Sequence, residues 1–297
     1  MIIAIGSIAL DTTRTPFKTV KDVLGGSGTY FGLASSFFSK TGIVAVVGKD
    51  FPEEYYKLLK DRLDVSGLKI VDGKTFRFDS SFDYDLGKRT TNKTELNVFE
   101  KFDPVLPEEY RTAEYVYLGN IDPEQQLKVL EQVNNPKLTV SDTIELWINT
   151  KRRKLIEVIS RVDCMVLNDD EVRQLCKTPN IINGAKTILD WGAKFVIVKK
   201  GEHGAILFTH DNIFPTPGYP LGNVVDPTGA GDSFAGGFLG HIARKDKLGE
   251  STIKEAVVYG NVMGSFAVED FSINSLLNLT LEQIEDRFQE YRNIVRF

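Results

Sequence analysis

The chain has 297 residues, 42% of them hydrophobic and 26% charged, with a net charge of −5 at pH 7. This balance fits one large globular α/β domain, and an acidic chain is poorly suited to hold nucleic acid by bulk charge. Two cysteines and three histidines without ligand spacing argue against a structural disulfide or a zinc site. With no signal peptide and no apolar segment long enough to span a bilayer, we expect a cytoplasmic protein without a membrane partner.

Short apolar runs alternate with amphipathic segments along most of the chain. Residues 181–191, for example, place their apolar side chains on one face of a helix. The alternation predicts a mainly parallel sheet covered by helices on both faces, with the active site beyond the carboxyl ends of the strands. The expected buried strands are residues 2–5, 43–47, 115–118, 138–141, 164–167 and 195–199.

Residues 75–84 have a different period. The aromatic residues Phe76, Phe78, Phe82 and Tyr84 all occupy even positions, which is typical of a half-exposed strand or a bent strand pair. Segments 10–21 and 95–99 are candidate partners for it. We therefore expect a single domain, residues 1–297, with a small protruding β-sheet lid built from residues of roughly 10–21 and 70–100. The sheet would serve as a lid, a homodimer interface or both. An edge extension without function is the weaker alternative, because so large an aromatic face needs covering.

The segment with the clearest chemistry is residues 223–238, NVVDPTGAGDSFAGGF. Polar and glycine-rich residues give way there to a helical run over 232–244, so the chain turns into a helix N-terminus. Free N–H groups and the helix dipole make such a turn a site for anions. Asp232 in the first helical turn is either a favourable N-terminal charge or, beside an anion site, a general base.

The motif DPTGAGDSFAGGF is similar to the second signature of the PfkB/ribokinase family of carbohydrate and nucleoside kinases. The resemblance implies that Gly229, Ala230 and Gly231 form the anion hole for the transferred phosphoryl group and that Asp232 activates the acceptor hydroxyl. It also implies a ribokinase-like (Rossmann-like) three-layer α/β sandwich that uses ATP and Mg²⁺.

Further segments resemble the acceptor site of this family. Residues 6–11, GSIALD, resemble the first strand, whose final aspartate holds acceptor hydroxyls; the same residue, Asp11, could instead cap a turn. Residues 25–30, GGSGTY, resemble a glycine-rich turn beside the acceptor, which implicates Gly25 and Gly26. Tyr30 replaces the asparagine of that turn and brings an aromatic face for a base or a sugar.

Two other positions bear on the acceptor. Ala9 replaces an asparagine that is frequent in ribokinases proper, so ribose itself is not supported as the substrate. Asn120, which follows the strand expected at 115–118, either points at the acceptor or caps the next helix.

Two further segments resemble the nucleotide site of this family. Residues 168–171 resemble the NxxE motif, in which Asn168 and Glu171 organise magnesium, water and phosphates; the pair also fits a helix cap with its capping-box partner, and both readings hold together. Residues 199–204 resemble a loop along the nucleotide, with Gly201 and Gly204 matching well. Lys199 stands there in place of a small hydroxyl residue and is a candidate phosphate contact.

Three further residues are weaker candidates for contact with the nucleotide or with a cation. Asn261, on a helix expected over 253–268, is a candidate for contact with adenine. Thr228 lies in the nucleotide turn, and Asp226 marks the place where several family members use a monovalent cation, which would be K⁺ here.

The sequence therefore predicts an ATP-dependent phosphotransferase that moves the γ-phosphate to a hydroxyl of a sugar or nucleoside, with Asp232 as general base. A sugar-phosphate acceptor stays open because Arg14, Arg77, Lys88 and Arg89 lie on or near the expected lid. The alternative from another class is a catalytically idle relative that senses a nucleotide or metabolite. The intact GAGD sequence argues against it, because a binding protein has no use for a base at that position.

Overall fold

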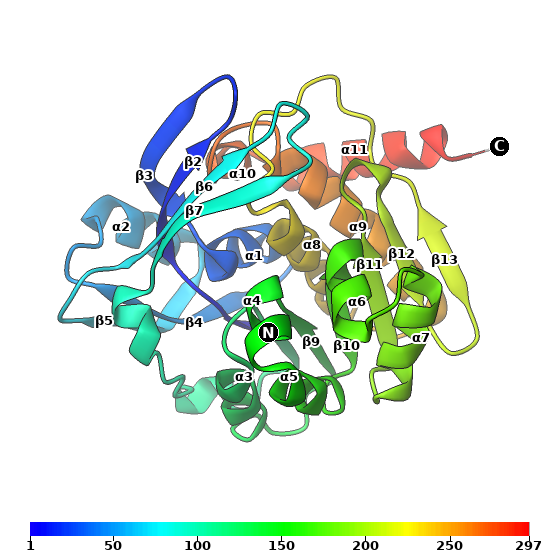
Figure 1. Ribbon diagram of the computed structural model, residues 1–297, viewed down its shortest axis with the longest axis horizontal. Coiled ribbons are helices and arrows are strands. Elements are labelled where there is room, and N and C mark those ends of the chain that lie inside the picture. The colour runs from blue at the N-terminus through cyan, green and yellow to red at the C-terminus, as the bar shows by residue number, and fades with distance from the viewer. Residues whose placement is uncertain (297) are drawn as a thin grey trace.

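The computed structural model describes residues 1–296 and is built on a nine-stranded sheet (Figure 1). Seven strands, from β11 to β5 in spatial order, run parallel, and β12 and β13 add an antiparallel edge. All six strands expected from the sequence belong to this sheet. In spatial order its strands are β13 (Ile213–Thr216), β12 (Ala205–Phe208), β11 (Phe195–Lys199), β10 (Cys164–Asn168), β9 (Leu138–Asp142), β8 (Tyr115–Leu118), β1 (Ile2–Ile5), β4 (Thr41–Gly48) and β5 (Asp64–Val71).

Both faces of the large sheet are buried, as the continuous apolar strands predict. In β1, Ile3 and Ile5 join a core on one face, whereas Ile2 and Ala4 join a core on the other, and all four are fully buried. The first core packs under helices α3–α7 and the second under α1, α8 and α9. The expected three-layer sandwich is confirmed.

The helices of both layers follow the expected boundaries closely. The segments expected at 181–191, 232–244 and 253–268 are α7, α8 and α9. One layer holds α3 (Pro123–Leu130), α4 (Glu145–Thr150), α5 (Arg152–Ile159), α6 (Asp169–Cys176) and α7 (Ile181–Asp190). The other holds α1 (Ser27–Ser36), α2 (Glu53–Arg62), α8 (Ala230–Lys245), α9 (Glu250–Ala267), α10 (Asn274–Leu277) and α11 (Leu281–Ile294), and three short 3-10 turns are η1 (Asn97–Lys101), η2 (Glu108–Tyr110) and η3 (Gly201–His203).

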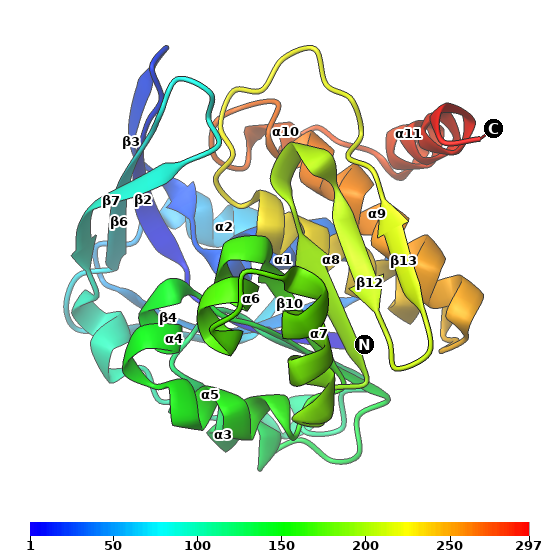
Figure 2. The same ribbon diagram turned by 45° about the vertical axis from the view of Figure 1, so that its right-hand side comes forward.

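A separate four-stranded sheet projects from one end of the molecule, as Figures 1 and 2 show. Its order is β3 (Thr19–Gly25), β2 (Ala9–Arg14), β6 (Phe76–Phe82) and β7 (Arg89–Glu95), with β2 and β6 parallel and the outer pairs antiparallel. The aromatic segment is thus strand β6. The partner expected at 95–99 is wrong: residues from Asn97 on form the turn η1, and β7 takes that place. A homodimer through this sheet stays a prediction.

The start of the chain also differs from the expectation. The first strand ends at Ile5, and Asp11 lies in β2 of the small sheet, so segment 6–11 is not one strand. The chain bends out of the large sheet at Gly6, where a Cβ atom would lie only 2.6 Å from the backbone nitrogen of Gly28. This close approach brings the N-terminus of α1 beside the end of β1, and it places Asp11 where the two sheets meet.

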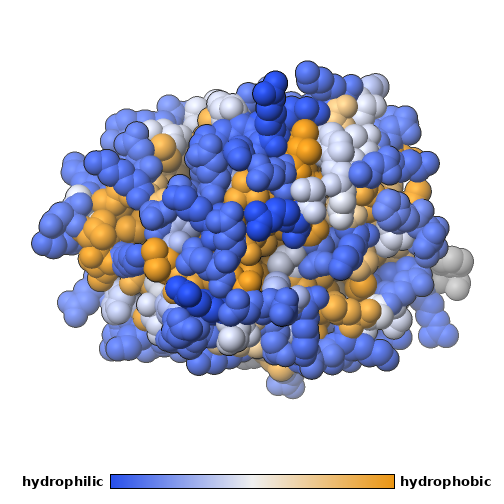
Figure 3. All heavy atoms as spheres, turned by 90° about the horizontal axis from the view of Figure 1, so that it is seen from below, coloured by the Kyte–Doolittle hydropathy of each residue, from blue (hydrophilic) through white to orange (hydrophobic). Residues whose placement is uncertain are grey.

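The surface of the molecule is mixed. On the face seen in Figure 3, hydrophilic side chains break the apolar areas into small patches. The most exposed large apolar residues are Phe17 and Tyr84, which lie beyond strands β2 and β6 and pack against each other with ring centroids 5.9 Å apart. Among residues 1–296 no helix combines the length and the apolar character needed to cross a membrane.

Candidate active site

The strand order reverses at β1, which has β4 on one side and β8 on the other. Ligands of open α/β sheets bind beyond the carboxyl ends of the strands at such a reversal. A cavity of about 110 Å³ lies there, with Ser7 from the end of β1 and Asn120 from the end of β8 in its wall. Seven residues expected from the sequence line this cavity: Asp11, Gly26, Tyr30, Asn120, Thr228, Gly229 and Asp232.

The expected anion turn leads directly into α8. Gly229 has φ +78°, a left-handed conformation that favours glycine, and Ala230 and Gly231 begin the helix. A Cβ atom on Gly229 would lie 2.3 Å from the ring of Tyr30. Tyr30 is only 2% exposed, so its ring packs under the turn and has little free face for an acceptor. The turn is therefore held from below by an aromatic ring, and its first N–H groups are free of intrahelical partners.

Asp232, in the first turn of α8, is half-buried at the cavity wall. Its Oδ1 accepts a hydrogen bond of 3.2 Å from the hydroxyl of Tyr117. Burial and the nearby carboxylate of Asp142 raise the pKa of Asp232 to about 6. At neutral pH the group is therefore ionised yet close to the pKa that suits proton transfer.

Asp11 faces the same cavity from β2 and is only 5% exposed. A Cβ atom on Gly25 would fall 1.9 Å from its Oδ2, so the glycine makes room for the carboxylate. Within residues 1–296 the buried Oδ1 has no hydrogen-bond partner. Burial and the charge of Asp226 raise the pKa of Asp11 to about 7. A buried acceptor without a partner at a cavity wall is suited to bind a hydroxyl group of a ligand.

The raised carboxyl pKa values predict how stability responds to pH. In the folded chain burial raises the pKa values of Asp11 and Glu171 to about 7 and that of Asp232 to about 6, all above their ordinary values. The folded state then binds more protons than the unfolded state, so the free energy of unfolding falls as the pH rises from about 4 to 7. His241, whose pKa burial lowers to about 4, acts in the opposite direction.

The substitution Asp11→Asn isolates one of these carboxylates. We expect it to raise the midpoint of thermal unfolding of the ligand-free protein by about 3 °C or more near pH 8 and by much less near pH 5. The contribution of His241 is common to both proteins and cancels in the difference. Scanning calorimetry across this range checks the expectation, and a difference that does not change with pH would contradict it.

Asn168 and Glu171 form the capping box of α6, as one of the two readings predicted. Asn168 Oδ1 accepts from the N–H of Glu171, and Glu171 Oε2 accepts from the N–H of Asn168, both at 2.8 Å. Burial and the charge of Asp142 raise the pKa of Glu171. The cap uses one oxygen of each side chain, which leaves lone pairs for water or a ligand.

Lys199 lies beside the anion turn but is not free. Its Nζ donates to Asp142 Oδ2 at 2.9 Å, and a Cβ atom on Gly231 would lie 2.9 Å from the same Nζ. Burial works to lower the pKa of Lys199, but the carboxylates of Asp142, Glu171 and Asp232 raise it overall. The ammonium group therefore stays charged within reach of any phosphate held by the turn.

Of the expected nucleotide residues only Thr228 lines the cavity; Asn168, Glu171 and Lys199 do not line it, and neither do Gly201, Gly204 and Asn261. Gly201 and Gly204 bracket the turn η3 with positive φ values, and the Cβ position of Gly204 is 2.2 Å from the carbonyl oxygen of Thr216. Asn261, on α9, donates from Nδ2 to Thr216 Oγ1 at 2.8 Å. Gly204 and Asn261 therefore meet at Thr216, whereas Gly201 only begins the turn that leads to Gly204.

Asp226 is buried below the anion turn. Its Oδ1 accepts from the N–H of Thr228 at 2.9 Å and its Oδ2 from the N–H of Ser272 at 3.3 Å. The alternative that Asn120 caps the following helix is wrong, because Asp122 caps α3. Asn120 lines the cavity.

Several residues at the site were not expected from the sequence. Asp142, at the end of β9, could have been found from the rule that functional side chains follow strands. Nothing in the sequence indicated that Tyr117 belongs to the site, because a tyrosine in an apolar strand is expected in the hydrophobic core. Phe76 and Phe78 of the small sheet also line the cavity, next to Arg89, which the sequence had offered only as a basic residue near the expected lid; its guanidinium lies 5.3 Å from the ring centre of Phe78.

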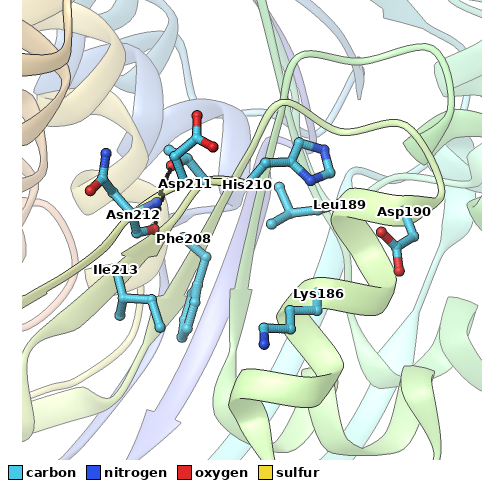
Figure 4. Close-up of a pocket in the computed structure, with 9 residues that line it drawn as sticks. Lys186, Leu189, Asp190, Phe208, His210, Asp211, Asn212 and Ile213 are labelled. Carbon is cyan, nitrogen blue, oxygen red and sulfur yellow. Dashed lines mark hydrogen bonds between the residues drawn. The ribbon is translucent and has the colours of Figure 1, made fainter.

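A larger cavity, of about 370 Å³, lies elsewhere, between α7 and the turn that joins β12 to β13 (Figure 4). Lys186, Leu189 and Asp190 of α7 line it together with His210, Asp211 and Asn212 of that turn. None of the residues expected from the sequence lines it. Size alone would favour this cavity, whereas the buried carboxylates and the anion turn favour the smaller one.

Comparison with known proteins agrees with this geometry. Residues 2–278 match the family described as pfkB family carbohydrate kinase. A cytidine kinase of Thermococcus kodakarensis is 32% identical over 256 residues, which cover 84% of this chain and 91% of that protein. The crystal structure of a nucleoside kinase of Methanocaldococcus jannaschii, of the ribokinase family, has 22% identity and a TM-score of 0.79 and covers 97% of this chain and 98% of its own. A nucleoside kinase of Burkholderia thailandensis in complex with ADP-inosine has 16% identity and a TM-score of 0.82, covering 99% and 96%.

The architecture, a three-layer α/β sandwich with a small second sheet, is thus shared with these solved structures. The chain belongs to the pfkB family of carbohydrate kinases. The expected ribokinase-like fold is confirmed, and so is the expected ATP-dependent kinase with a sugar or nucleoside acceptor.

Proposed function

We propose that this chain transfers the γ-phosphate of MgATP to the primary hydroxyl of a nucleoside, with cytidine as the first candidate. The observation that carries the proposal is the mixed lining of the cavity. It brings the carboxylates of Asp11 and Asp232, which suit the hydroxyls of a ribose, together with the aromatic rings of Phe76 and Phe78, which suit a planar base. The 32% identity to a cytidine kinase supports the same acceptor class.

The proposed reaction follows from these positions. Asp11 and Asn120 hold the sugar, and Asp232 takes the proton of the attacking hydroxyl. The hydroxyl oxygen forms a bond to the γ-phosphorus, the bond from that phosphorus to the β,γ-bridging oxygen breaks, and ADP leaves. The N–H groups of residues 229–231 and the ammonium of Lys199 stabilise the charge that develops on the transferred group.

The residues present fit a magnesium ion that arrives with the nucleotide. Within residues 1–296 no cluster of three or more His, Cys, Asp or Glu side chains could hold a metal. Mg²⁺ in kinases is commonly held by one or two carboxylates, water and the phosphates. Asn168 and Glu171 would hold it through water, and when bound it neutralises charge on the phosphate oxygens.

We extend the proposal to a monovalent cation beside Asp226. Burial raises the pKa of Asp226, which means that its negative charge is costly where it lies. The two N–H groups that it accepts from leave further lone pairs on its oxygens. K⁺ bound there would offset the buried charge and stiffen the turn at Thr228.

A sugar-phosphate acceptor fits the lid less well. Arg14 forms an ion pair with Asp79, and Arg77 pairs with Asp22 and, at 3.2 Å, with Asp50. Of the four basic residues named above, only Arg89 lines the cavity. A single arginine beside an aromatic ring favours an uncharged acceptor over a phosphorylated one.

The test is ADP release with MgATP across pyrimidine and purine nucleosides, free sugars and sugar phosphates. We expect turnover on nucleosides and least activity on sugar phosphates. Turnover on free sugars alone would overturn the nucleoside assignment. ATP binding without turnover on any acceptor would instead support the idle relative that senses a nucleotide.

The lid wall gives a narrower prediction. Phe78→Ala removes one aromatic face, so we expect the KM for the nucleoside to rise about 10-fold while kcat changes much less. Phe17→Ala, which removes an exposed ring from the β2–β3 turn of the same sheet, is the matched control and should leave KM unchanged. Initial rates against nucleoside concentration measure both constants. Equal KM values for the wild type and Phe78→Ala would mean that the base does not contact this wall.

A further inference from the structure

A tyrosine of the central sheet contacts the candidate base, Asp232, from the interior of the protein. Tyr117 lies in β8, and its side chain is fully buried under α8. Its ring stacks on Phe31 of α1 with ring centroids 3.8 Å apart and an angle of 2° between the planes. Because one side of the ring is fixed in this way and the surrounding core is closely packed, the direction of the hydroxyl is fixed as well.

The hydroxyl of Tyr117 donates one hydrogen bond, to the candidate base. It donates to Asp232 Oδ1 at 3.2 Å, and among residues 1–296 no other side chain forms a hydrogen bond with this carboxylate. Burial and the charges of Asp232 and Asp142 raise the pKa of Tyr117 well above its ordinary value, so the phenol stays protonated and acts only as a donor. Asp232 Oδ2 is left for the acceptor.

We infer that Tyr117 is a positioning residue for the phosphoryl transfer: its hydroxyl orients the carboxylate of Asp232 toward the acceptor and keeps it ionised. The inference rests on the proposed function, in which Asp232 is the base. A hydrogen bond to a carboxylate favours its charged form, and it also restrains rotation of the group. Both effects serve a base whose other oxygen must meet a substrate hydroxyl.

The ionisation of Asp232 depends on charges from every neighbouring element. Burial and Asp142 raise its pKa, whereas Lys199, the Tyr117 hydroxyl and Arg89 lower it. Removal of the Tyr117 hydroxyl keeps the influences that raise the pKa of Asp232 and deletes one that lowers it. The pKa of Asp232 must then rise further, so a smaller fraction of the Asp232 carboxyl group is ionised at a given pH. The charged groups involved are Asp142 of β9, Lys199 of β11, Arg89 of β7, Asp11 of β2 and Glu171 of α6.

The substitution Tyr117→Phe tests this inference, because it keeps the ring and its stacking on Phe31 and removes only the hydroxyl. Tyr115→Phe is the matched control: it lies in the same strand and loses a hydrogen bond of 2.6 Å to Asp246, at the far end of α8. The measurement is kcat/KM for the nucleoside between about pH 5 and 9, with single turnovers to follow the chemical step.

For Tyr117→Phe we expect the acidic limb of the profile to move up by about one pH unit. The rate near pH 6.5 should fall about 3-fold, with the loss approaching about 10-fold near pH 5 and disappearing near pH 8.5, and the KM for MgATP should be unchanged. Tyr115→Phe should keep the wild-type profile. An acidic limb that does not move in Tyr117→Phe would overturn the inference, and so would a rate loss that is the same at every pH.

A parallel assay separates this inference from the proposal on which it rests. If Asp232→Asn is inactive and Tyr117→Phe has a wild-type profile, only the role of Tyr117 is wrong. If Asp232→Asn keeps near-normal turnover, the proposed base itself is wrong.

Discussion

Replacement of Asp232 by asparagine is expected to lower kcat by about 10²- to 10⁴-fold while MgATP binding is largely kept. The amide has nearly the shape of the carboxylate but cannot take the proton of the attacking hydroxyl. The residues expected to hold the nucleotide, Asn168, Glu171 and Lys199, keep their positions in the variant. Single-turnover phosphoryl transfer and a nucleotide-binding titration measure the two properties separately.

Asp246→Asn is the matched control, because Asp246 ends the same helix and lies far from the cavity. It has φ +49°, a conformation that asparagine tolerates. We expect wild-type turnover from this variant. If Asp232→Asn transferred phosphate at a rate within a few-fold of the wild type, the assignment of the base would be refuted.

Gly229→Ala is expected to lower kcat by about 10²-fold or more and to reduce thermal stability. The added methyl group would lie 2.3 Å from the ring of Tyr30 at a residue with φ +78°, so both sterics and backbone strain act against it. The turn must shift, and its N–H groups then no longer point at the transferred phosphate. Loss of one such donor alone costs about 10²- to 10³-fold in enzymes with similar anion holes.

Gly222→Ala provides the comparison, since a Cβ atom there would meet no atom within 4 Å. It lies in the same loop, before the motif, and should keep both activity and melting temperature. Rates and thermal midpoints of the two variants show whether the effect belongs to the turn. A fully active Gly229→Ala would mean that the N–H groups of this turn do not bind the phosphate.

The large sheet was predictable because each of its central strands is a short run of apolar residues, buried on both faces. The motif at 223–238 likewise led directly to the turn and to α8, since glycine-rich residues and a helical run are local signals. The capping box of Asn168 and Glu171 is another local pattern that the structure confirms. Local signals of this kind need no knowledge of what lies across the fold.

The rest depended on contacts between distant segments. The pairing of Tyr117 with Asp232 joins residues 115 positions apart, and nothing in an apolar strand shows which residue a hydroxyl will meet. Asp11 was expected at the end of the first strand because residues 6–11 resemble the first strand of the family, whereas the chain bends at Gly6, where α1 approaches. Tyr30 offered an aromatic face in the sequence, but the fold uses that face to support Gly229.

The most direct test of the central claim is the fate of the γ-phosphate. The protein would be mixed with MgATP labelled in that phosphate and with cytidine, and the products identified by mass spectrometry. The proposal predicts label on the primary hydroxyl of the nucleoside, equal in amount to the ADP formed and absent with Asp232→Asn. Label found only in inorganic phosphate, across all nucleosides offered, would contradict it.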